Sequence, residues 1–129
     1  MDFGDGLRGK RVLLTEDDAV LASNMTFLLE DCGARVDGPK RTVRDAMRAV
    51  AAHAPDAAIL DVELLDGEVF PVSDHLKALD VPFVFYTAKG SKGYEQAKVD
   101  GAPIMSKSRS SDEPIRRLMR EVERRARRA

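Results

Sequence analysis

The chain has 129 residues, of which 43% are hydrophobic and 33% charged, and its formal net charge is −1. This is the composition of one ordinary folded domain, and it excludes a disordered tail, a collagen-like repeat and a disulfide-built scaffold. The single cysteine, Cys32, cannot form a bridge within the chain, so the fold does not depend on oxidation. No apolar run is long enough to span a membrane, and the N-terminal sequence lacks a signal-peptide pattern, so we expect a cytoplasmic protein.

The charge is unevenly distributed along the chain. Residues 107–129 hold nine Lys/Arg and four Asp/Glu, whereas residues 1–106 hold twelve Lys/Arg and eighteen Asp/Glu. An acidic body is therefore followed by a basic C-terminal segment.

Short apolar runs alternate with helical patterns along the chain. In its first half, the sequence predicts a buried strand at 11–15, a helix through Leu21–Cys32 that stops at Gly33, a weaker strand at 34–36, a helix capped by Thr42 that ends before Pro55, and an apolar strand at 57–60. In its second half, it predicts a loop at 62–67, a helix through Val69–Leu79 with Pro71 in its first turn, a strand at 81–86, a short helix within 88–100, a strand at 103–106 and a helix from about Asp112.

This order predicts an α/β domain with a doubly wound, five-stranded parallel sheet flanked by five helices, because continuous apolar strands are typical of sheets covered on both faces. We expect one domain over 1–129, with an N-terminal extension at 1–9 and the basic helix at 112–129 included in it. Ligands of such sheets bind at the carboxyl edge of the strands.

Polar residues follow four of the predicted strands at that edge. They are Glu16 and Asp17, then Asp61, Thr87 and Lys107. Converging carboxylates repel one another by about 4 kcal/mol per pair at 4 Å in a medium of effective dielectric 20, so the cluster favours a cation, and a few hard oxygen ligands suit Mg²⁺. Such an ion neutralises an incoming phosphoryl group, for which Asp61 is a candidate nucleophile and Thr87 and Lys107 are candidate partners.

The ordered set of motifs resembles the receiver domain of two-component response regulators, which has a flavodoxin-like fold. The matching pieces are VLLTEDD ending at Asp18, AAILDVE around Asp61, FVFYTA around Thr87, and MSK ending at Lys107. The resemblance covers nearly the whole chain and implies a signalling domain rather than an enzyme.

The resemblance also implies residue roles. Asp61 accepts a phosphoryl group from a histidine kinase or phosphotransfer protein, and Thr87 and Lys107 sense that group. Asp17 and Asp61 bind Mg²⁺, Glu16 binds it mostly through water, and Glu63 offers its main-chain carbonyl. Asp18 remains an alternative to Asp17 as the direct ligand.

The sequence departs from the family pattern in two places and carries one further feature there. Ser108 follows Lys107 where the family usually has Pro, and Ile104 stands where many receivers carry an aromatic switch residue. Lys89 and Glu63 occupy positions that tune phosphoryl lifetime in the family, and we hypothesise that they pair across the site.

Two alternative functions compete with a phosphorylated signalling module. The first is a degenerate receiver that binds a partner without phosphate. The second is a phosphatase of the haloacid dehalogenase type, which is disfavoured because Glu63 stands where that family has a second aspartate.

The sequence also bears on partners. Only one helix follows Lys107, so we expect no output domain and signalling through an unidentified protein partner. The C-terminal arginines are interpreted first as a solvated helix face, with an acidic partner or a homodimer as further candidates and nucleic acid disfavoured. No membrane interaction is expected.

Overall fold

The computed structural model describes residues 4–107 and 110–128. In chain order the elements are β1 (Arg11–Thr15), α1 (Ala19–Asp31), β2 (Arg35–Lys40), α2 (Val43–Ala52), β3 (Ala57–Leu60), β4 (Glu63–Leu64), β5 (Gly67–Glu68), α3 (Phe70–Ala78), β6 (Phe83–Thr87), α4 (Tyr94–Asp100), β7 (Ile104–Ser106) and α5 (Asp112–Arg128).

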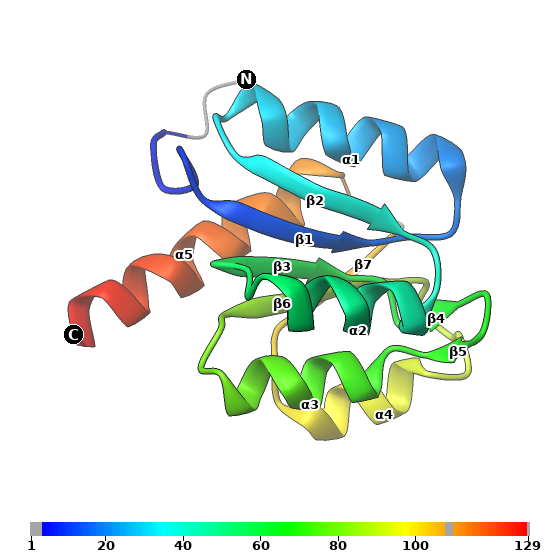
Figure 1. Ribbon diagram of the computed structural model, residues 1–129. Helices are drawn as coiled ribbons and strands as arrows, with labels where there is room; N and C mark the ends of the chain where they lie inside the picture. Colours follow the sequence, from blue (N-terminus) through cyan, green and yellow to red (C-terminus); the bar gives the residue numbers. More distant parts are fainter. Residues whose placement is uncertain (1–3, 108–109, 129) are drawn as a thin grey trace.

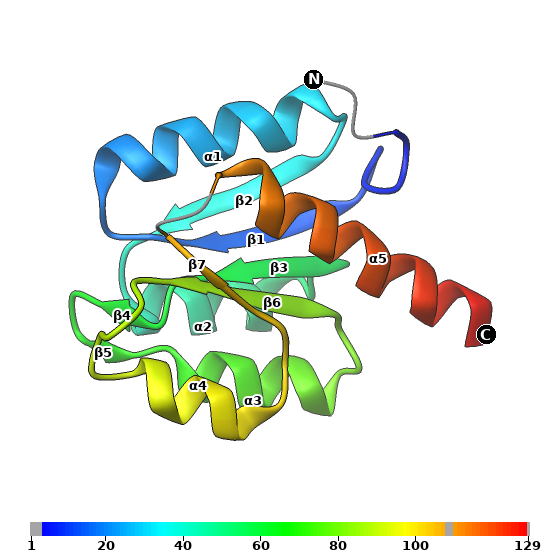
Figure 2. The same ribbon diagram turned by 180° about the vertical axis from the view of Figure 1, so that it is seen from behind.

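The main sheet has five parallel strands in the order β2-β1-β3-β6-β7. Helices α1 and α5 cover one face, and α2, α3 and α4 cover the other (Figures 1 and 2). This confirms the predicted doubly wound fold, because each of the helices α1 to α4 returns the chain to the start of another strand of the parallel sheet.

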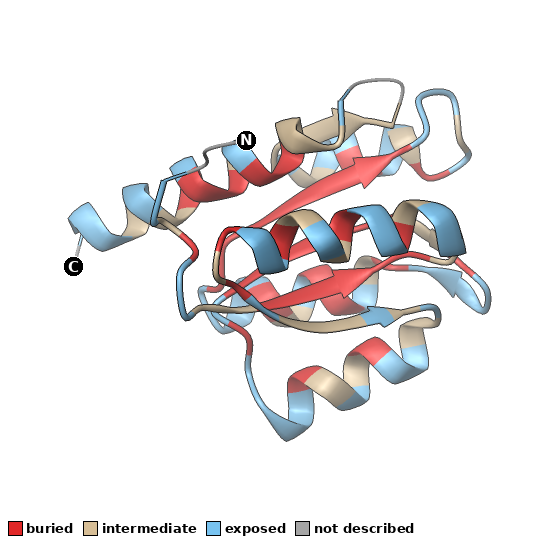
Figure 3. Ribbon diagram, turned by 90° about the horizontal axis from the view of Figure 1, so that it is seen from above, coloured by how far each residue is buried: buried red, intermediate tan, exposed pale blue. Residues whose placement is uncertain are grey.

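Two hydrophobic cores hold these layers together. Val12 and Leu14 of β1 face the core beneath α1 and α5, whereas Leu13 faces the core beneath α2, α3 and α4. The alternation follows from the period of two in a strand, and it explains why β1 reads as a continuous apolar run. Figure 3 shows the central strands almost wholly buried and the helices in view buried on their inner sides.

The strand register brings the predicted site residues to one edge. Thr15 pairs with Leu60, and Thr87 pairs with Ser106, so these four strands end nearly level. The next residues along the chain, Glu16, Asp61 and Lys107, therefore emerge together at the carboxyl edge of the sheet.

Two predicted segments differ in the structure. The strand β2 extends to Lys40, well beyond the predicted end at residue 36. It is the edge strand of the sheet, so its polar residues pair with β1 without an apolar pattern. The predicted loop at 62–67 holds most of an antiparallel pair, in which Leu64 of β4 pairs with Gly67 of β5 and Glu63 pairs with Glu68, one residue beyond the predicted loop. Two-residue strands leave no periodicity in a sequence, so this pair was not predictable from the pattern.

The helix ends follow local chemistry. Asp18 caps α1 through bonds to the amides of Val20 and Leu21, and Thr42 caps α2 through the amide of Asp45. Gly33 takes a positive φ of 87° just after α1, which confirms the predicted stop.

The two ends of the described chain pack differently. Leu7, within the predicted N-terminal extension, is fully buried in the core beneath α1 and α5. In α5, no residue after Glu121 is buried, and the last turns project beyond the sheet (Figures 1 and 2). No helix among the described residues is long and apolar enough to cross a membrane.

Candidate functional site

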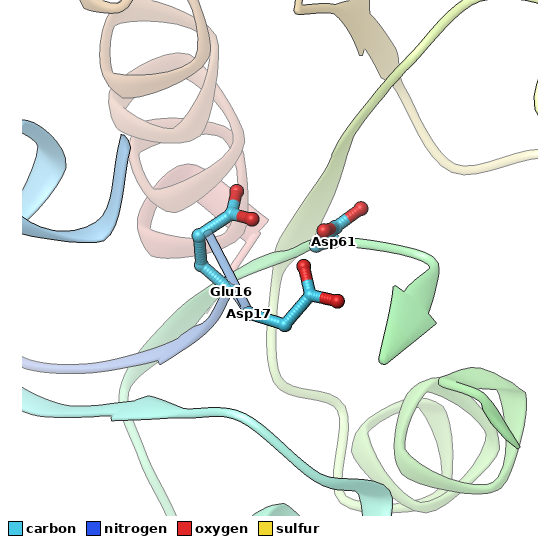
Figure 4. Close-up of side chains that lie close together, drawn as sticks. All are labelled: Glu16, Asp17 and Asp61. Carbon is cyan, nitrogen blue, oxygen red and sulfur yellow. The ribbon is translucent and has the colours of Figure 1, made fainter. Parts of the chain in front are cut away.

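Three carboxylates meet where β1 and β3 end. Glu16 and Asp17 follow β1, Asp61 follows β3, and one carboxylate oxygen from each lies within 4.8 Å of the others. Figure 4 shows the three side chains gathered around one space at the carboxyl edge of the sheet. The sequence predicted this convergence from the strand ends.

Burial makes it costly for the carboxylates of the cluster to carry negative charge. Glu16 is 3% exposed and Asp61 is 4% exposed. Burial raises the pKa of Glu16, and the charge of Asp61 raises it further, to about 7, although hydrogen bonds from Lys107 and from the Asp18 amide act in the opposite direction. The site therefore favours any group that brings positive charge to these oxygens.

Lys107 supplies one positive charge. Its Nζ donates to Asp61 Oδ2 and to Glu16 Oε2, each at 2.9 Å. Burial by itself lowers the pKa of Lys107, but the hydrogen bonds and charges of Asp61 and Glu16 outweigh that effect and raise the pKa overall. Lys107 is thus held as a cation between the two acids.

Thr15 fixes the main chain of Asp61. The Thr15 hydroxyl oxygen accepts a hydrogen bond from the Asp61 amide at 2.9 Å and donates to the Asp61 carbonyl at 3.2 Å. Both residues are buried, so water does not compete for these bonds. The sequence alone did not indicate this role of Thr15; the one signal it offered was a hydroxyl residue at the last position of the first apolar strand.

The structure distinguishes Asp17 from Asp18. The Asp18 carboxylate is used by the α1 cap, where Oδ1 accepts from two amides, whereas Asp17 contributes to the cluster. Arg41 donates to the Asp17 carbonyl at 3.3 Å and ties this loop to the end of β2. The structure thus places Asp17, and not Asp18, among the three clustered carboxylates.

Thr87 and Ile104 lie on neighbouring strands. Thr87 ends β6 and is buried, and its carbonyl accepts a hydrogen bond from the Lys107 amide at 3.0 Å. Ile104 begins β7 opposite Phe85 and packs against the core beneath α3 and α4. The predicted effect of Ser108 lies outside the described residues.

The hypothesised pair between Lys89 and Glu63 is not formed. The Glu63 carboxylate instead accepts a hydrogen bond from the Gly93 amide at 3.3 Å, just before α4. A Cβ on Gly93 would come within 2.3 Å of Val62 Cγ1. Glu63 therefore joins the segment after Asp61 to the start of α4, a contact between distant segments that spacing in the sequence does not reveal.

The donor set fits a hard divalent cation. Three carboxylates offer oxygen ligands, and their mutual repulsion is only partly compensated by one lysine charge. Mg²⁺ accepts such a small set of carboxylates together with retained waters. The side chain of Glu63 lies outside this cluster, so only its main chain is a candidate ligand.

A mostly apolar hollow opens beside the cluster. It has a volume of about 480 Å³ and lies between α1 and the end of β2, with Glu16, Ala19, Ala22, Phe27 and Pro39 in its lining. Phe27 is 67% exposed and Val20, seven residues earlier on α1, is 78% exposed. Large apolar side chains at such exposure beside a polar site are typical of an interaction surface.

Comparison with known proteins identifies the family. No protein-family model matches the chain. Over 80 residues, 60% of its length, the chain is 34% identical to the phyllosphere-induced regulator PhyR of Methylorubrum extorquens. The non-phosphorylated HemR receiver domain of Leptospira biflexa is 31% identical with a TM-score of 0.73, over 88% of this chain and 94% of that one. The signal receiver domain of a LuxO repressor protein from Vibrio parahaemolyticus is 25% identical with a TM-score of 0.78, over 93% of this chain and 95% of that one.

The chain therefore belongs to the receiver domains of two-component response regulators, which are signalling proteins rather than enzymes. It covers 30% of the length of PhyR, 41% of the sensory transduction protein LytT of Bacillus anthracis and 36% of the virulence transcriptional regulatory protein PhoP of Salmonella typhimurium. The resemblance found in the motifs is thus confirmed at the level of the family and the fold.

Proposed function

We propose that the domain is a phospho-accepting receiver in which Asp61 takes a phosphoryl group from a histidine kinase or phosphotransfer protein and passes the signal on through protein contacts. The observation that carries this proposal is the placement of Asp61 between Lys107, at 2.9 Å, and the carboxylates of Glu16 and Asp17.

The chemical step uses an Asp61 carboxylate oxygen as the nucleophile. That oxygen forms a bond to phosphorus while the bond from phosphorus to the donor histidine nitrogen breaks, and the released imidazole takes up a proton. Thr15 holds the Asp61 main chain, and Lys107 holds Oδ2, so the carboxylate is oriented before the donor arrives. The product is an aspartyl acyl phosphate.

The cation site belongs to this step. Asp17 and Asp61 would ligate Mg²⁺ directly, Glu16 through water, and Glu63 through its main-chain carbonyl. Bound Mg²⁺ supplies positive charge that offsets the repulsion between a phosphoryl group and the carboxylates.

Lys107 and Thr87 would respond to the transferred group. The phosphoryl group adds nearly two negative charges beside Lys107, which then has a stronger partner than the Asp61 carboxylate. The Lys107 amide is bonded to the Thr87 carbonyl, so movement at either residue is transmitted between β6 and the segment after β7. The side chain of Ile104 has no hydrogen-bonding group, so coupling through that side chain acts by packing.

The hollow along α1 is the proposed docking surface for the phosphodonor protein. It has Glu16 in its lining and so reaches the acidic cluster, and its exposed Phe27 offers an apolar anchor. A donor seated there would bring its phosphohistidine close to the acidic cluster, because Glu16 lines the hollow.

Intact mass spectrometry tests the proposal. After incubation with Mg²⁺ and a small phosphodonor such as acetyl phosphate, we expect one phosphoryl adduct, which is absent with EDTA and in Asp61→Asn. A folded chain that binds Mg²⁺ but gains no adduct from the small donor or from histidine kinases would support a phosphate-independent binding module instead.

A further inference from the structure

The outward face of α5 carries a row of four arginines, which we call the outer arginine stripe: Arg116, Arg120, Arg124 and Arg127. They are spaced by four, four and three residues, so they lie on one side of the helix. All four are exposed, whereas Ile115, Leu118 and Met119 are buried on the side toward the sheet. The stripe therefore faces away from the domain.

Internal ion pairs compensate only part of this charge. Arg116 pairs with Asp112 at 2.9 Å, and Arg124 lies 3.6 Å from Glu121. Within the described part of the chain, Arg120 and Arg127 have no ion pair. Arg125 and Arg128, outside the stripe, are both within reach of Asp80 on the loop after α3.

The position of the stripe leaves it accessible. The last turns of α5 project beyond the sheet in both ribbon views (Figures 1 and 2). No residue of α5 after Glu121 is buried against the domain. A partner can therefore contact the end of the stripe without meeting the rest of the surface.

We propose that the outer arginine stripe docks an acidic protein segment. Arginine presents a planar fork of donors that matches carboxylates, and an uncompensated pair such as Arg120 and Arg127 gains most from such a match. On a helix these two residues lie about 10 Å apart along the axis. A partner helix with carboxylates one to two turns apart offers the same spacing.

The charges of the rest of the chain favour protein over nucleic acid as the partner. Residues 1–106 hold eighteen acidic and twelve basic residues, so the body of the domain repels a long polyanion. The exposed Glu123 lies on the same helix face, between Arg120 and Arg127, where a continuous phosphate backbone would meet it. A protein segment can place a neutral or basic residue at that point.

This inference goes beyond the proposed function. Helix α5 starts near the end of β7 and runs back along the sheet, so its last turns lie at the opposite end of the sheet from the carboxyl edge (Figure 2). Docking there needs neither Mg²⁺ nor phosphorylation, and a negative result leaves the proposed role of Asp61 untouched.

The test measures binding of a labelled helical peptide with glutamates at positions i, i+4 and i+7, by fluorescence anisotropy at low and physiological salt. The test variant is Arg120→Gln/Arg124→Gln/Arg127→Gln. The matched control is Arg35→Gln/Arg44→Gln/Arg48→Gln, which removes three exposed arginines from β2 and α2. We expect affinity to fall by about tenfold in the test variant and by less than about twofold in the control.

Four results would overturn the proposal. The unmodified chain fails to bind the glutamate peptide more tightly than a peptide with glutamine in those positions. Both triple variants lose affinity equally, which indicates non-specific charge attraction. A DNA duplex binds more tightly than the peptide with the same dependence on the stripe, which assigns the surface to nucleic acid. The unmodified chain forms a dimer at low salt that only the test variant abolishes, which assigns the surface to a second copy.

Discussion

The hydroxyl of Thr15 and the main chain of Asp61 are joined by two hydrogen bonds, at 2.9 Å to the amide and 3.2 Å to the carbonyl, although 46 residues separate them. The pair links the end of β1 to the end of β3 at the point where the acidic cluster begins. The position of the Asp61 carboxylate thus depends on a neighbouring strand as well as on its own.

Thr15→Val tests this link. The substitution keeps the shape but removes the hydroxyl from a buried site, so we expect a loss of about 1–2 kcal/mol of unfolding free energy. The rate of phosphorylation by a small donor is also expected to fall, because the nucleophile is less well fixed. Urea unfolding and intact mass measure the two effects. Thr15→Ser keeps the hydroxyl and should retain most of both, and equal behaviour of the two variants would contradict the role of these bonds.

Lys107 and a divalent cation compete for the same oxygens. Lys107→Ala removes a positive charge 2.9 Å from both Glu16 and Asp61, so we expect Mg²⁺ to bind more tightly, on the order of tenfold, at low salt. Isothermal titration calorimetry measures the change. Lys89→Ala is the control, since Lys89 is an exposed cation near the same edge without a described ion pair. Weaker Mg²⁺ binding in Lys107→Ala would show that the lysine supports the cation site instead of competing with it.

Substitution of Phe27 tests docking of the donor protein separately from the chemical step. Phe27→Ala removes the exposed anchor beside the hollow on α1, so phosphotransfer from a histidine kinase that loads the unmodified chain should slow by about tenfold. Phosphorylation by acetyl phosphate should be unchanged, because the small donor does not use that surface. Val99→Ala provides the control: Val99 is 81% exposed on α4, across the sheet from α1. Equal slowing with both donors, or with both variants, would contradict the proposed docking surface.

The ionised carboxylate of Asp66 is expected to stabilise the folded domain, and this stabilisation depends on pH. Its carboxylate accepts hydrogen bonds from the amides of Val43 and Arg44 at the start of α2, and these bonds lower the pKa of Asp66 below its ordinary value. A group with a lowered pKa in the folded state stabilises the fold above its unfolded pKa, and this contribution is lost as pH falls through the folded pKa. Asp66→Asn should therefore lower the Tm near neutral pH and flatten its fall toward acid pH.

Thermal unfolding over a pH series measures this effect. The control Asp74→Asn changes an exposed acid whose carboxylate has no described hydrogen bond, so the dependence of Tm on pH should stay as in the unmodified chain. Parallel curves for the unmodified chain and Asp66→Asn would show that Asp66 does not titrate with the fold.

The sheet and the identity of its edge were predictable because buried strands leave continuous apolar runs. Those runs placed Glu16, Asp61 and Lys107 at strand ends, and parallel pairing in register brought them together. The motifs that the resemblance matched lie on the same edge, so pattern and family agree on the fold and on which residues to examine.

The parts that could not be predicted depend on contacts between distant segments. Nothing in the sequence spacing indicated that the Glu63 carboxylate accepts a hydrogen bond from the Gly93 amide instead of pairing with Lys89. Nor did it indicate that the Thr15 hydroxyl bonds to the main chain of Asp61. Nor did the sequence indicate that the Asp18 carboxylate caps α1 while the Asp17 carboxylate lies in the acidic cluster. The second half of β2, residues 37–40, has no apolar pattern. Because β2 is the edge strand of the sheet, it is held there by main-chain hydrogen bonds to β1 and does not need buried apolar side chains.

The most direct test of the central claim is to locate the phosphoryl group. After phosphorylation with Mg²⁺ and acetyl phosphate, borohydride reduces an aspartyl acyl phosphate to homoserine, and tandem mass spectrometry of the digested chain identifies the converted position. We expect homoserine at position 61 alone, with none at 17 or 18 and none when EDTA is present. Conversion at another carboxylate, or phosphate retained on a hydroxyl that borohydride does not reduce, would contradict the assignment of Asp61 as the acceptor.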